Sequence, residues 1–361
     1  MKIYYDYQML IEQKYGGISR YFYELINHLN NREDVTTEIK CLFNINEYFA
    51  EMFGNPACKI PHISRVSKPL NKICSLHMIG KNCDIIHPTY FDPYILKRKD
   101  APIVITVHDM IHELFPDIMC YDKNIVSYKK QMIYGADHII AVSQNTKKDI
   151  LKVYPDIDED KITVIYHGNS FRNKASQKIE LPEEYVLYVG TRDLYKNFDN
   201  FMIAMKQLMS RNKKLYLVCA GGGKLSNKEK GIIGDYIDRV VQMDIKDSYM
   251  PLLYQQAICL VFPSKYEGFG IPIIEAFSCD CPVVLSNAGP MPEIAGDAGL
   301  YFDPNDVEEM ENRILAVIQN DDIRKSLSEE GRRQLENYNW DKTAEETYIC
   351  YKKVRNNWNR N

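Results

Sequence analysis

The sequence predicts an α/β protein made of two doubly wound domains, each with a parallel sheet covered by helices on both faces. Short apolar runs alternate with amphipathic stretches from the N-terminus to Tyr166, and the same alternation restarts at Tyr185. The polar stretch Gly168–Glu180 between them has no apolar period, so we interpret it as an interdomain linker. A chain of 361 residues is long enough for two cores. We therefore expect domains at residues 1–168 and 182–339.

The first half contains apolar or β-branched runs that predict strands, separated by segments with helical periodicity. The expected strands are Lys2–Tyr7, Thr36–Phe43, Cys83–Pro88, Ile103–Val107, His138–Val142 and Lys161–Tyr166. The expected helices are Gly17–Asn30, Tyr121–Gly135 and Gln144–Tyr154.

The second half repeats this pattern and ends in three helical stretches. Its expected strands are Tyr185–Val189, Leu215–Ala220, Val240–Met243, Cys259–Phe262 and Val283–Ser286. Its expected helices are Phe198–Met209, Leu225–Ile233, Tyr249–Ala257 and Ile271–Cys279. Two domains of this kind in tandem present strand ends and helix starts to a crevice, so we expect a ligand cleft between them.

The composition excludes several classes of protein. With 45 basic and 49 acidic residues the net charge is −4, so no overall field favours nucleic acid. The chain begins Met-Lys-Ile-Tyr-Tyr-Asp and has no apolar run near 18 residues, so we expect a cytoplasmic protein. The ten cysteines include no Cys-x-x-Cys pair, which favours reduced thiols over zinc ligands.

The segment from Glu267 to Glu275 gives the strongest indication of function. It reads Glu-Gly-Phe-Gly-Ile-Pro-Ile-Ile-Glu and follows a buried strand that ends in Pro-Ser. Gly268 and Gly270 allow the backbone to approach a ligand, and a helix starting near Ile271 offers unpaired N–H groups to a phosphate. The two flanking carboxylates suit sugar hydroxyls, because a carboxylate accepts hydrogen bonds and repels a phosphate.

This segment, followed by Cys-Pro-Val-Val, resembles the Glu-x7-Glu motif of the retaining family 4 glycosyltransferases of GT-B fold, and the resemblance covers nearly the whole chain. It implies that Glu267 contacts the transferred sugar and Glu275 the ribose of the nucleotide. Gly268, Phe269, Gly270 and Ile271 would form the donor-binding loop between them. It also implies two Rossmann-like domains facing across a cleft, with a last helix, Trp340–Trp358 within about 340–361, crossing back onto the first domain. Asp280 stands where relatives commonly carry Gly.

Two other loops match the family in the first domain. Gly16 and Gly17 join the first strand to the first helix, where backbone N–H groups can lie beside an anion. The matching loop of the family lies over the donor diphosphate. Thr-Val-His-Asp places His108 after a buried strand, and the resemblance implies that His108 meets the transferred hexose. We expect Asp109 to orient the local backbone or the imidazole.

The second domain opens with Tyr-Val-Gly-Thr-Arg-Asp-Leu-Tyr-Lys-Asn, a strand followed by Gly190 and two cations. Fixed cations stabilise a departing diphosphate without a metal. Lys196 matches the family's phosphate lysine. Many relatives carry Arg immediately before that lysine, whereas this chain has Tyr195, so we assign the second cation to Arg192.

Further motifs exclude two other site types. Gly221–Gly223 forms a strand-to-helix turn without the spacing of a dinucleotide fingerprint, so a nicotinamide enzyme is not expected. The acidic run Asp156–Asp160 reads as a solvated turn, so we expect no metal site.

One segment is unusually basic. Residues 59–81 contain five cations, two histidines and no acid, with Leu70, Ile73, Leu76 and Met78 at roughly helical spacing. Such a segment can dock on an anionic membrane surface, which would suit a lipid-linked acceptor. An ordinary helix packed on the first sheet, with a basic outer face, explains the same pattern.

The resemblance implies transfer of a hexose, with mannose from GDP-mannose as a first guess, from a nucleotide sugar to a hydroxyl of a glycan or lipid-linked glycan. No cofactor or metal is implied, and the leaving phosphate oxygen assists deprotonation of the acceptor on the same face. Two alternatives remain open: a GT-B-type nucleotide-sugar 2-epimerase, and a catalytically silent nucleotide-sugar-binding protein.

Overall fold

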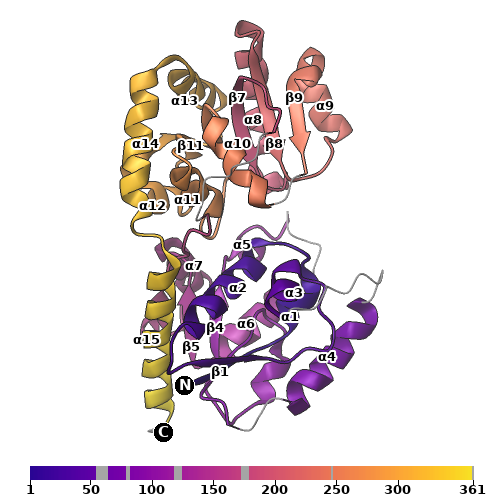
Figure 1. The fold of residues 1–361 in the computed structure, drawn as a ribbon, viewed down its shortest axis with the longest axis vertical. Helices are drawn as coiled ribbons and strands as arrows, with labels where there is room; N and C mark the ends of the chain where they lie inside the picture. Colours follow the sequence, from indigo (N-terminus) through magenta and orange to yellow (C-terminus); the bar gives the residue numbers. More distant parts are fainter. Residues whose placement is uncertain (54–63, 79–81, 118–123, 172–178, 245–246, 360–361) are drawn as a thin grey trace. The chain divides into compact units, whose positions relative to one another are not determined.

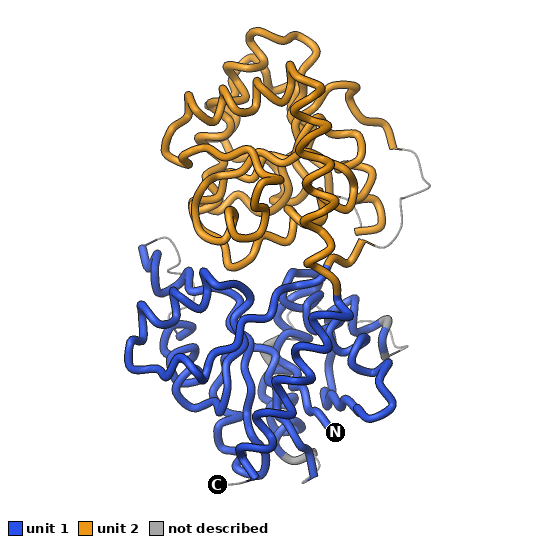
Figure 2. The backbone as a smooth tube through the Cα atoms, turned by 90° about the vertical axis from the view of Figure 1, so that its left-hand side faces the viewer, with its two compact units in different colours: residues 1–168, 340–361 blue, residues 169–339 orange. Residues whose placement is uncertain are grey.

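A computed structural model describes residues 1–361 except 54–63, 79–81, 118–123, 172–178, 245–246 and 360–361. The chain divides into two compact units, which Figure 2 distinguishes by colour. Unit 1 comprises Met1–Gly168 together with Trp340–Asn361, and unit 2 comprises Asn169–Asn339. Each unit is an α/β structure built on parallel strands, which confirms the predicted fold class.

The sheet of unit 1 is formed by two parallel three-stranded sets. The first set has the order β2 (Thr36–Ile39), β1 (Lys2–Tyr5), β3 (Ile85–His87). The second has the order β4 (Val104–Val107), β5 (His138–Ala141), β6 (Ile162–Val164). A parallel bridge between Ile86 and Ile103 joins them. Because β1 is followed by β2 on one side and later by β3 on the other, the topological switch point lies between β1 and β3.

Helices surround this sheet. They are α1 (Gln8–Glu12), α2 (Gly17–Asn30), α3 (Glu47–Phe53), α4 (Ser64–Met78), α5 (Ile111–Leu114), α6 (Ile125–Gly135), α7 (Gln144–Val153) and α15 (Trp340–Trp358), with 3-10 turns η1 (Pro93–Lys97) and η2 (Glu159–Lys161). The sequence did not indicate α1, α3 or α5. The expected helix from Tyr121 begins instead at Ile125, and residues 121–123 lie outside the described part of the chain.

The C-terminal helix α15 belongs to unit 1 and completes its core (Figure 1). It packs along α2, and its Trp340, Tyr348 and Tyr351 lie in one apolar cluster with residues of β1. A buried polar chain crosses this cluster: His87 hydrogen-bonds through Nδ1 to the Tyr351 hydroxyl and through Nε2 to Thr106 Oγ1 at 2.9 Å. The last helix is therefore held to the central strands by both packing and hydrogen bonds.

Unit 2 contains one six-stranded parallel sheet with the order β12-β11-β10-β7-β8-β9. Numbered within the unit, this is the order 6-5-4-1-2-3 of a doubly wound dinucleotide-type domain. The strands are β7 (Glu184–Val189), β8 (Leu215–Ala220), β9 (Val240–Met243), β10 (Cys259–Phe262), β11 (Val283–Ser286) and β12 (Gly299–Phe302). The edge strand β12 was not expected from the sequence.

The helices of unit 2 cover both faces of this sheet (Figure 1). They are α8 (Phe198–Arg211), α9 (Asn227–Ile233), α10 (Met250–Gln256), α11 (Ile271–Ser278), α12 (Met291–Ala295), α13 (Val307–Gln319) and α14 (Asp321–Leu335), with 3-10 turns η3 (Leu194–Lys196), η4 (Gly234–Arg239), η5 (Asp247–Tyr249) and η6 (Gly296–Ala298). The amphipathic α8 buries Phe201, Met202 and Met205 in the core.

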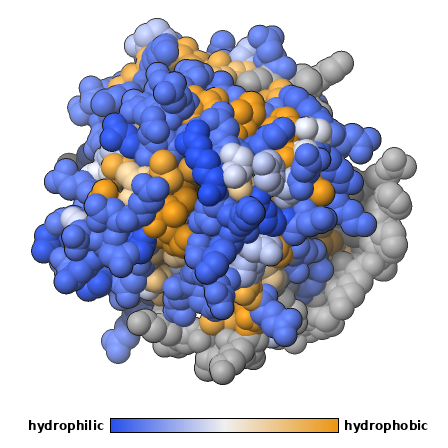
Figure 3. Space-filling model, turned by 90° about the horizontal axis from the view of Figure 1, so that it is seen from above, coloured by the Kyte–Doolittle hydropathy of each residue, from blue (hydrophilic) through white to orange (hydrophobic). Residues whose placement is uncertain are grey.

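The outer surface in Figure 3 is mostly hydrophilic, with hydrophobic side chains in separate patches. Among the described residues no helix is both long and apolar enough to cross a bilayer. No disulfide joins the eight cysteines that the structure describes.

Asp280 follows α11 with a φ of 58°, in the left-handed region that favours glycine. Its side chain accepts a hydrogen bond from Arg332 Nε at 2.7 Å, and its carbonyl accepts one from Ser328. Glycine would adopt this backbone conformation without strain, in line with the glycine that the family resemblance implies at this position.

We expect Asp280→Gly to change the free energy of unfolding by less than about 1 kcal/mol, because relief of backbone strain offsets the lost exposed ion pair and the greater freedom of the unfolded chain. Asp280→Val should destabilise by at least about 1 kcal/mol, because a β-branched residue is poorly tolerated at positive φ. Thermal unfolding of both variants, compared with that of the control Arg332→Ala, measures these changes in the free energy of unfolding. A valine variant no less stable than Arg332→Ala would show that backbone conformation is not the constraint.

Burial, together with His108, lowers the pKa of His87 to about 3. The unfolded chain takes up a proton near pH 6.5 and the folded protein does not, so this histidine removes stability as the pH falls from about 6.5 toward 3. Its contribution should fall by about 1.4 kcal/mol between pH 7.5 and 5.5. Both tryptophans lie in α15, so their fluorescence during urea unfolding reports on unit 1. In His87→Asn the change in the free energy of unfolding between pH 7.5 and 5.5 should be smaller by that amount. An unchanged pH dependence of this free energy would contradict the lowered pKa of His87.

Candidate active site

The switch point of unit 2 lies between β7 and β10, which are neighbours in the sheet. Gly190 follows β7 with a φ of +130°, and a Cβ at this position would meet open space. The chain then forms η3, which ends at Lys196, while the loop after β10 carries Glu267. The carboxyl ends of these two strands therefore bring the predicted lysine and the first predicted carboxylate to one edge of the sheet.

Lys196 and Glu267 form an ion pair at this edge, with Nζ 2.7 Å from Oε1. The two side chains are only 15% and 13% exposed, so the pair is largely removed from solvent. Desolvation lowers the pKa of Lys196. The charge of Glu267, its hydrogen bond and the nearby Tyr195 raise this pKa by more than desolvation lowers it, so the net shift is upward. Lys196 therefore stays charged, and the two loops are tied together again where Lys265 N donates to the Tyr195 carbonyl at 2.8 Å.

The glycine loop after Glu267 leads into α11. Gly268, Phe269 and Gly270 are buried, and Gly270 precedes the helix with a φ of +102°. A Cβ at Gly270 would lie 2.9 Å from Ile273 Cδ1, so both conformation and space require glycine. No side chain caps the start of α11 at Ile271. Pro272 has no N–H and the Ile273 N–H donates to the Gly270 carbonyl at 2.9 Å, so the start of α11 offers an anion mainly the positive end of the helix dipole.

Glu275 lies one turn into α11 and is buried. Its Oε2 accepts a hydrogen bond from the Tyr254 hydroxyl at 2.8 Å. Burial, followed by the charge of Glu275, raises the pKa of Tyr254 well above its ordinary value, so the hydroxyl remains a donor. The carboxylate predicted to bind ribose is thus fixed by a tyrosine from α10.

Arg192 is engaged within unit 2. Its Nε donates to Glu229 Oε1 at 2.7 Å, and its other nitrogens donate to the carbonyls of Gly221, Gly223 and Lys224. The three glycines of this loop all have positive φ, and a Cβ at Gly222 would lie 2.5 Å from the guanidinium. The side chain therefore shapes the loop after β8, and its predicted contact with diphosphate stays a prediction.

In unit 1, Gly16 and Gly17 lie where the sequence predicts, at the start of α2. Gly16 precedes the helix, no side chain caps it, and Ser19 Oγ donates to the Gly16 carbonyl at 3.0 Å. Gly17 is exposed, so the first turn of α2 is accessible.

His108 follows β4 in unit 1. Its Nε2 is buried and lacks a hydrogen-bond partner among the described residues. Burial lowers its pKa to about 4, with Asp109 raising and Lys129 lowering it, so the imidazole is neutral near pH 7. The ring meets Tyr21 edge-on, with centroids 5.1 Å apart. Asp109 Oδ1 accepts from the Ile111 backbone at 3.1 Å, so it orients the loop rather than the imidazole.

The sequence analysis missed Lys129, which supports this loop. It is 1% exposed and donates to Glu113 Oε2 at 2.9 Å and to the Asp109 carbonyl at 3.1 Å. Lys129 lies on the buried face of α6 with Ile125, Met132 and Ile133, so a lysine within an apolar helical stripe was the available signal.

The helix α4 in the basic segment differs from the ordinary packed helix that was one of the two predictions for it, and the predicted membrane contact stays a prediction. Residues 59–63 and 79–81 lie outside the described residues, whereas α4 buries a polar stripe, Ser67, Asn71 and Ser75. Leu70 and Ile73 are 39% and 56% exposed, so they do not form the packed face. Lys68 pairs with Glu12 and Lys72 with Asp92, in place of a freely solvated basic face.

No group of three or more His, Cys, Asp or Glu side chains within the described ranges could hold a metal ion.

Comparisons with known proteins identify the family of this chain. Residues 15–169 match Glycosyltransferase Family 4 and residues 169–334 match glycosyl transferases group 1. O-antigen chain mannosyltransferase B of Escherichia coli is 30% identical over 286 residues, 73% of either chain. O-antigen chain mannosyltransferase RfbU of Salmonella typhimurium is 30% identical over 217 residues, 60% of either chain.

Solved structures share the fold. Sucrose-phosphate synthase from Thermosynechococcus elongatus has a TM-score of 0.77 at 20% identity, with 98% of each chain covered. Anabaena HepE in complex with UDP and glucose has a TM-score of 0.73 at 16% identity, with 97% of this chain and 98% of that chain covered. The chain therefore belongs to the group 1, family 4 glycosyltransferases, and has the GT-B fold.

Proposed function

We propose that this enzyme moves a hexose from a nucleoside diphosphate sugar to a hydroxyl of a glycan or lipid-linked glycan, with retention of anomeric configuration and without a metal. Mannose is the first candidate for the hexose, because the two bacterial relatives at 30% identity are named as O-antigen mannosyltransferases. A nucleoside diphosphate donor is supported by the Anabaena structure of the same fold, which is described with UDP and glucose.

The observation that carries the proposal is the Lys196–Glu267 pair at the switch point of unit 2. A fixed ammonium beside the start of α11 can stabilise the negative charge that develops on a departing diphosphate. The paired carboxylate keeps lone pairs for sugar hydroxyls while its own charge is balanced. Cation, carboxylate and helix start are held by the fold before any ligand arrives, which is the arrangement that electrostatic catalysis requires.

In the proposed reaction the acceptor oxygen bonds to the anomeric carbon while the bond from that carbon to the diphosphate oxygen breaks. The acceptor proton passes to the departing phosphate oxygen on the same face, so the configuration is retained. His108 remains neutral and offers its unpartnered Nε2 to a hexose hydroxyl. Lys196 holds the charge of the leaving diphosphate, and Glu275 accepts from the ribose diol.

The cytoplasmic location and contact of residues 59–81 with an anionic membrane surface belong to this proposal. Exposure of Leu70 and Ile73 on α4 supports the membrane contact, because apolar side chains beside lysines favour an interfacial position.

Incubation of the protein with GDP-mannose, an α-mannoside acceptor and excess EDTA should give an α-linked product, identified by NMR of its anomeric proton. Lys196→Ala should lower the rate on the order of 100-fold, as for other groups that stabilise transition-state charge. Lys230→Ala, at an exposed lysine elsewhere in unit 2, is the control. Loss of activity in EDTA that magnesium or manganese restores would contradict metal independence, and sugar conversion without acceptor would indicate an epimerase.

Replacing Glu275 with Gln should weaken the binding of both the donor and the free nucleotide by about 1–3 kcal/mol, because a charge-assisted hydrogen bond to the ribose is lost. Tyr254→Phe is the matched control, since it removes the protein partner of Glu275 and leaves the carboxylate. Calorimetric titration with GDP measures both. Unchanged nucleotide affinity in Glu275→Gln would remove the ribose assignment.

A further inference from the structure

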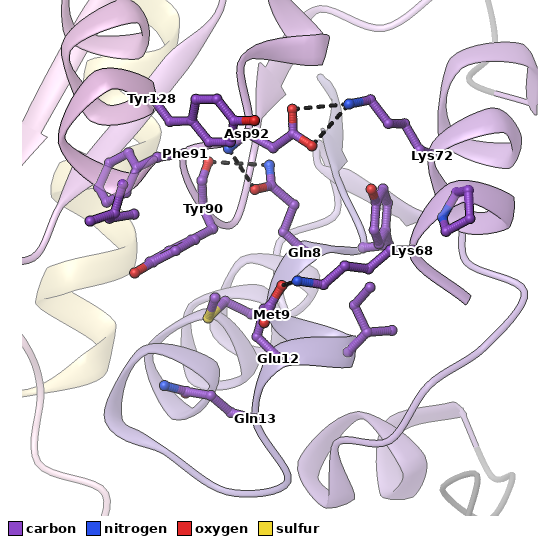
Figure 4. A pocket seen from close by; sticks show the side chains of 14 residues that line it. Gln8, Met9, Glu12, Gln13, Lys68, Lys72, Tyr90, Phe91, Asp92 and Tyr128 are labelled. Carbon is purple, nitrogen blue, oxygen red and sulfur yellow. Dashed lines mark hydrogen bonds and ion pairs between the residues drawn. The ribbon is translucent and has the colours of Figure 1, made fainter. Parts of the chain in front are cut away.

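Unit 1 contains a pocket of about 550 Å³, and none of its lining residues has a role in the reaction steps described above. Its walls come from α1, α4, α6 and the loop after β3, which Figure 4 shows from close by. Tyr7 and Gln8 lie two and three residues after the end of β1, and Tyr90 to Asp92 lie in the loop after β3, so the pocket lies at the switch point of this sheet. Ligands of open parallel sheets bind at such a point.

The lining combines aromatic rings with paired charges. Tyr90, Phe91 and Tyr128 supply rings, and Lys68 and Lys72 extend from α4 toward two carboxylates (Figure 4). Lys68 Nζ lies 2.5 Å from Glu12 Oε1, and Lys72 Nζ lies 3.0 Å from Asp92 Oδ2. Rings offer flat apolar area, while the two pairs offer both donors and acceptors.

The charge balance argues for a neutral ligand. Each lysine already faces a carboxylate at close range, so a phosphate entering here would meet two acids and would have to break both pairs. Hydroxyl groups meet no such penalty, because one hydroxyl can accept from a lysine and donate to the adjacent carboxylate. A pyranose has hydroxyls at its edge and C–H groups on its face, which matches this lining.

A buried network holds the pocket floor in place. Asp6 is fully buried and accepts hydrogen bonds from the Gln8 side chain at 2.6 Å and from the Thr89 backbone and hydroxyl at 2.8 Å. The Gln8 amide oxygen in turn accepts from Asp92 N at 2.8 Å. Gln8 and Asp92 are thus fixed before a ligand binds, which reduces the cost of ordering them.

The pocket also lies on the same sheet edge as the predicted donor contacts of unit 1. His108 follows β4 and the pocket residues follow β1 and β3, and these parallel strands end at one edge. Lys129, which supports the His108 loop, lies 5.5 Å from the centre of the Phe91 ring that lines the pocket. A saccharide held here would share this edge with the hexose-contacting histidine.

We propose that this pocket binds a neutral sugar unit of the glycan acceptor, with the pyranose packed on Tyr90 and Tyr128 and its hydroxyls on the Lys72–Asp92 pair. The inference rests on the proposed glycosyl transfer and names the part of the acceptor that unit 1 recognises. It gives Lys68 and Lys72 a role other than attraction to a membrane.

Binding is tested directly by saturation-transfer NMR with the methyl glycosides of mannose, glucose, galactose and N-acetylglucosamine. At least one should bind to the wild-type protein, and Tyr128→Ala and Lys72→Gln should weaken that binding by about tenfold. Tyr134→Ala is the matched control, because Tyr134 is an exposed tyrosine on the same helix outside the pocket. This readout needs no turnover, so it separates failure of the pocket from failure of the proposed transfer.

In the transfer assay the same two variants should raise the acceptor KM about tenfold and leave the donor KM unchanged. Any of three results would overturn the proposal. The acceptor KM could be unaltered in the two variants, none of the four glycosides could bind to the wild-type protein, or Tyr128→Ala could bind the glycoside as tightly as the wild type does. A further result would overturn it in favour of an anionic ligand. The wild type would then bind inorganic phosphate or phosphatidylglycerol vesicles but no glycoside, and the double variant Lys68→Gln/Lys72→Gln would bind neither the phosphate nor the vesicles.

Discussion

Parallel strand pairing is the constraint on which the rest of this structure depends. All strand pairs among the described residues are parallel, so each connection must cross a face of the sheet before the next strand begins. The carboxyl ends of the strands then gather at one edge. Lys196 and Glu267 are 71 residues apart in sequence, yet the adjacency of β7 and β10 brings them to 2.7 Å. In unit 1 the same constraint collects the residues after β1, β3 and β4.

The sequence predicted the long periodic elements well and the short ones poorly. Helices such as α2 and α8 have enough turns for an apolar stripe to appear, whereas α1, α3 and α5 have four to seven residues and show no period. The strand β12 is four residues that begin with Gly, a weak strand former. Short elements are fixed by the tertiary contacts around them.

The positions of individual candidate residues in the fold were predictable from their motifs, but their partners were not. The spacing of Glu267 and Glu275 indicated two carboxylates at one helix start, yet nothing in it indicated Lys196 or Tyr254 as the partner of either. The sequence indicated Arg192 as an available cation, whereas in the fold its guanidinium donates to carbonyls of the glycine loop. Charge counted along residues 59–81 likewise omitted Glu12 and Asp92, because ion pairing depends on neighbours that the fold supplies.

The return of α15 to unit 1 reverses the order in which the two cores become complete during synthesis. Unit 2 is continuous in sequence, from Asn169 to Asn339. The core of unit 1, in contrast, is completed only after residues 340–361 have been synthesised. Domains of a nascent chain usually fold from the N-terminus onward. Here the N-terminal core, with the aromatic side chains of β1 and α2 uncovered, must persist until the final helix emerges. Proteins cut short after residue 339 would retain that exposed surface, which is the form that proteases and chaperones recognise.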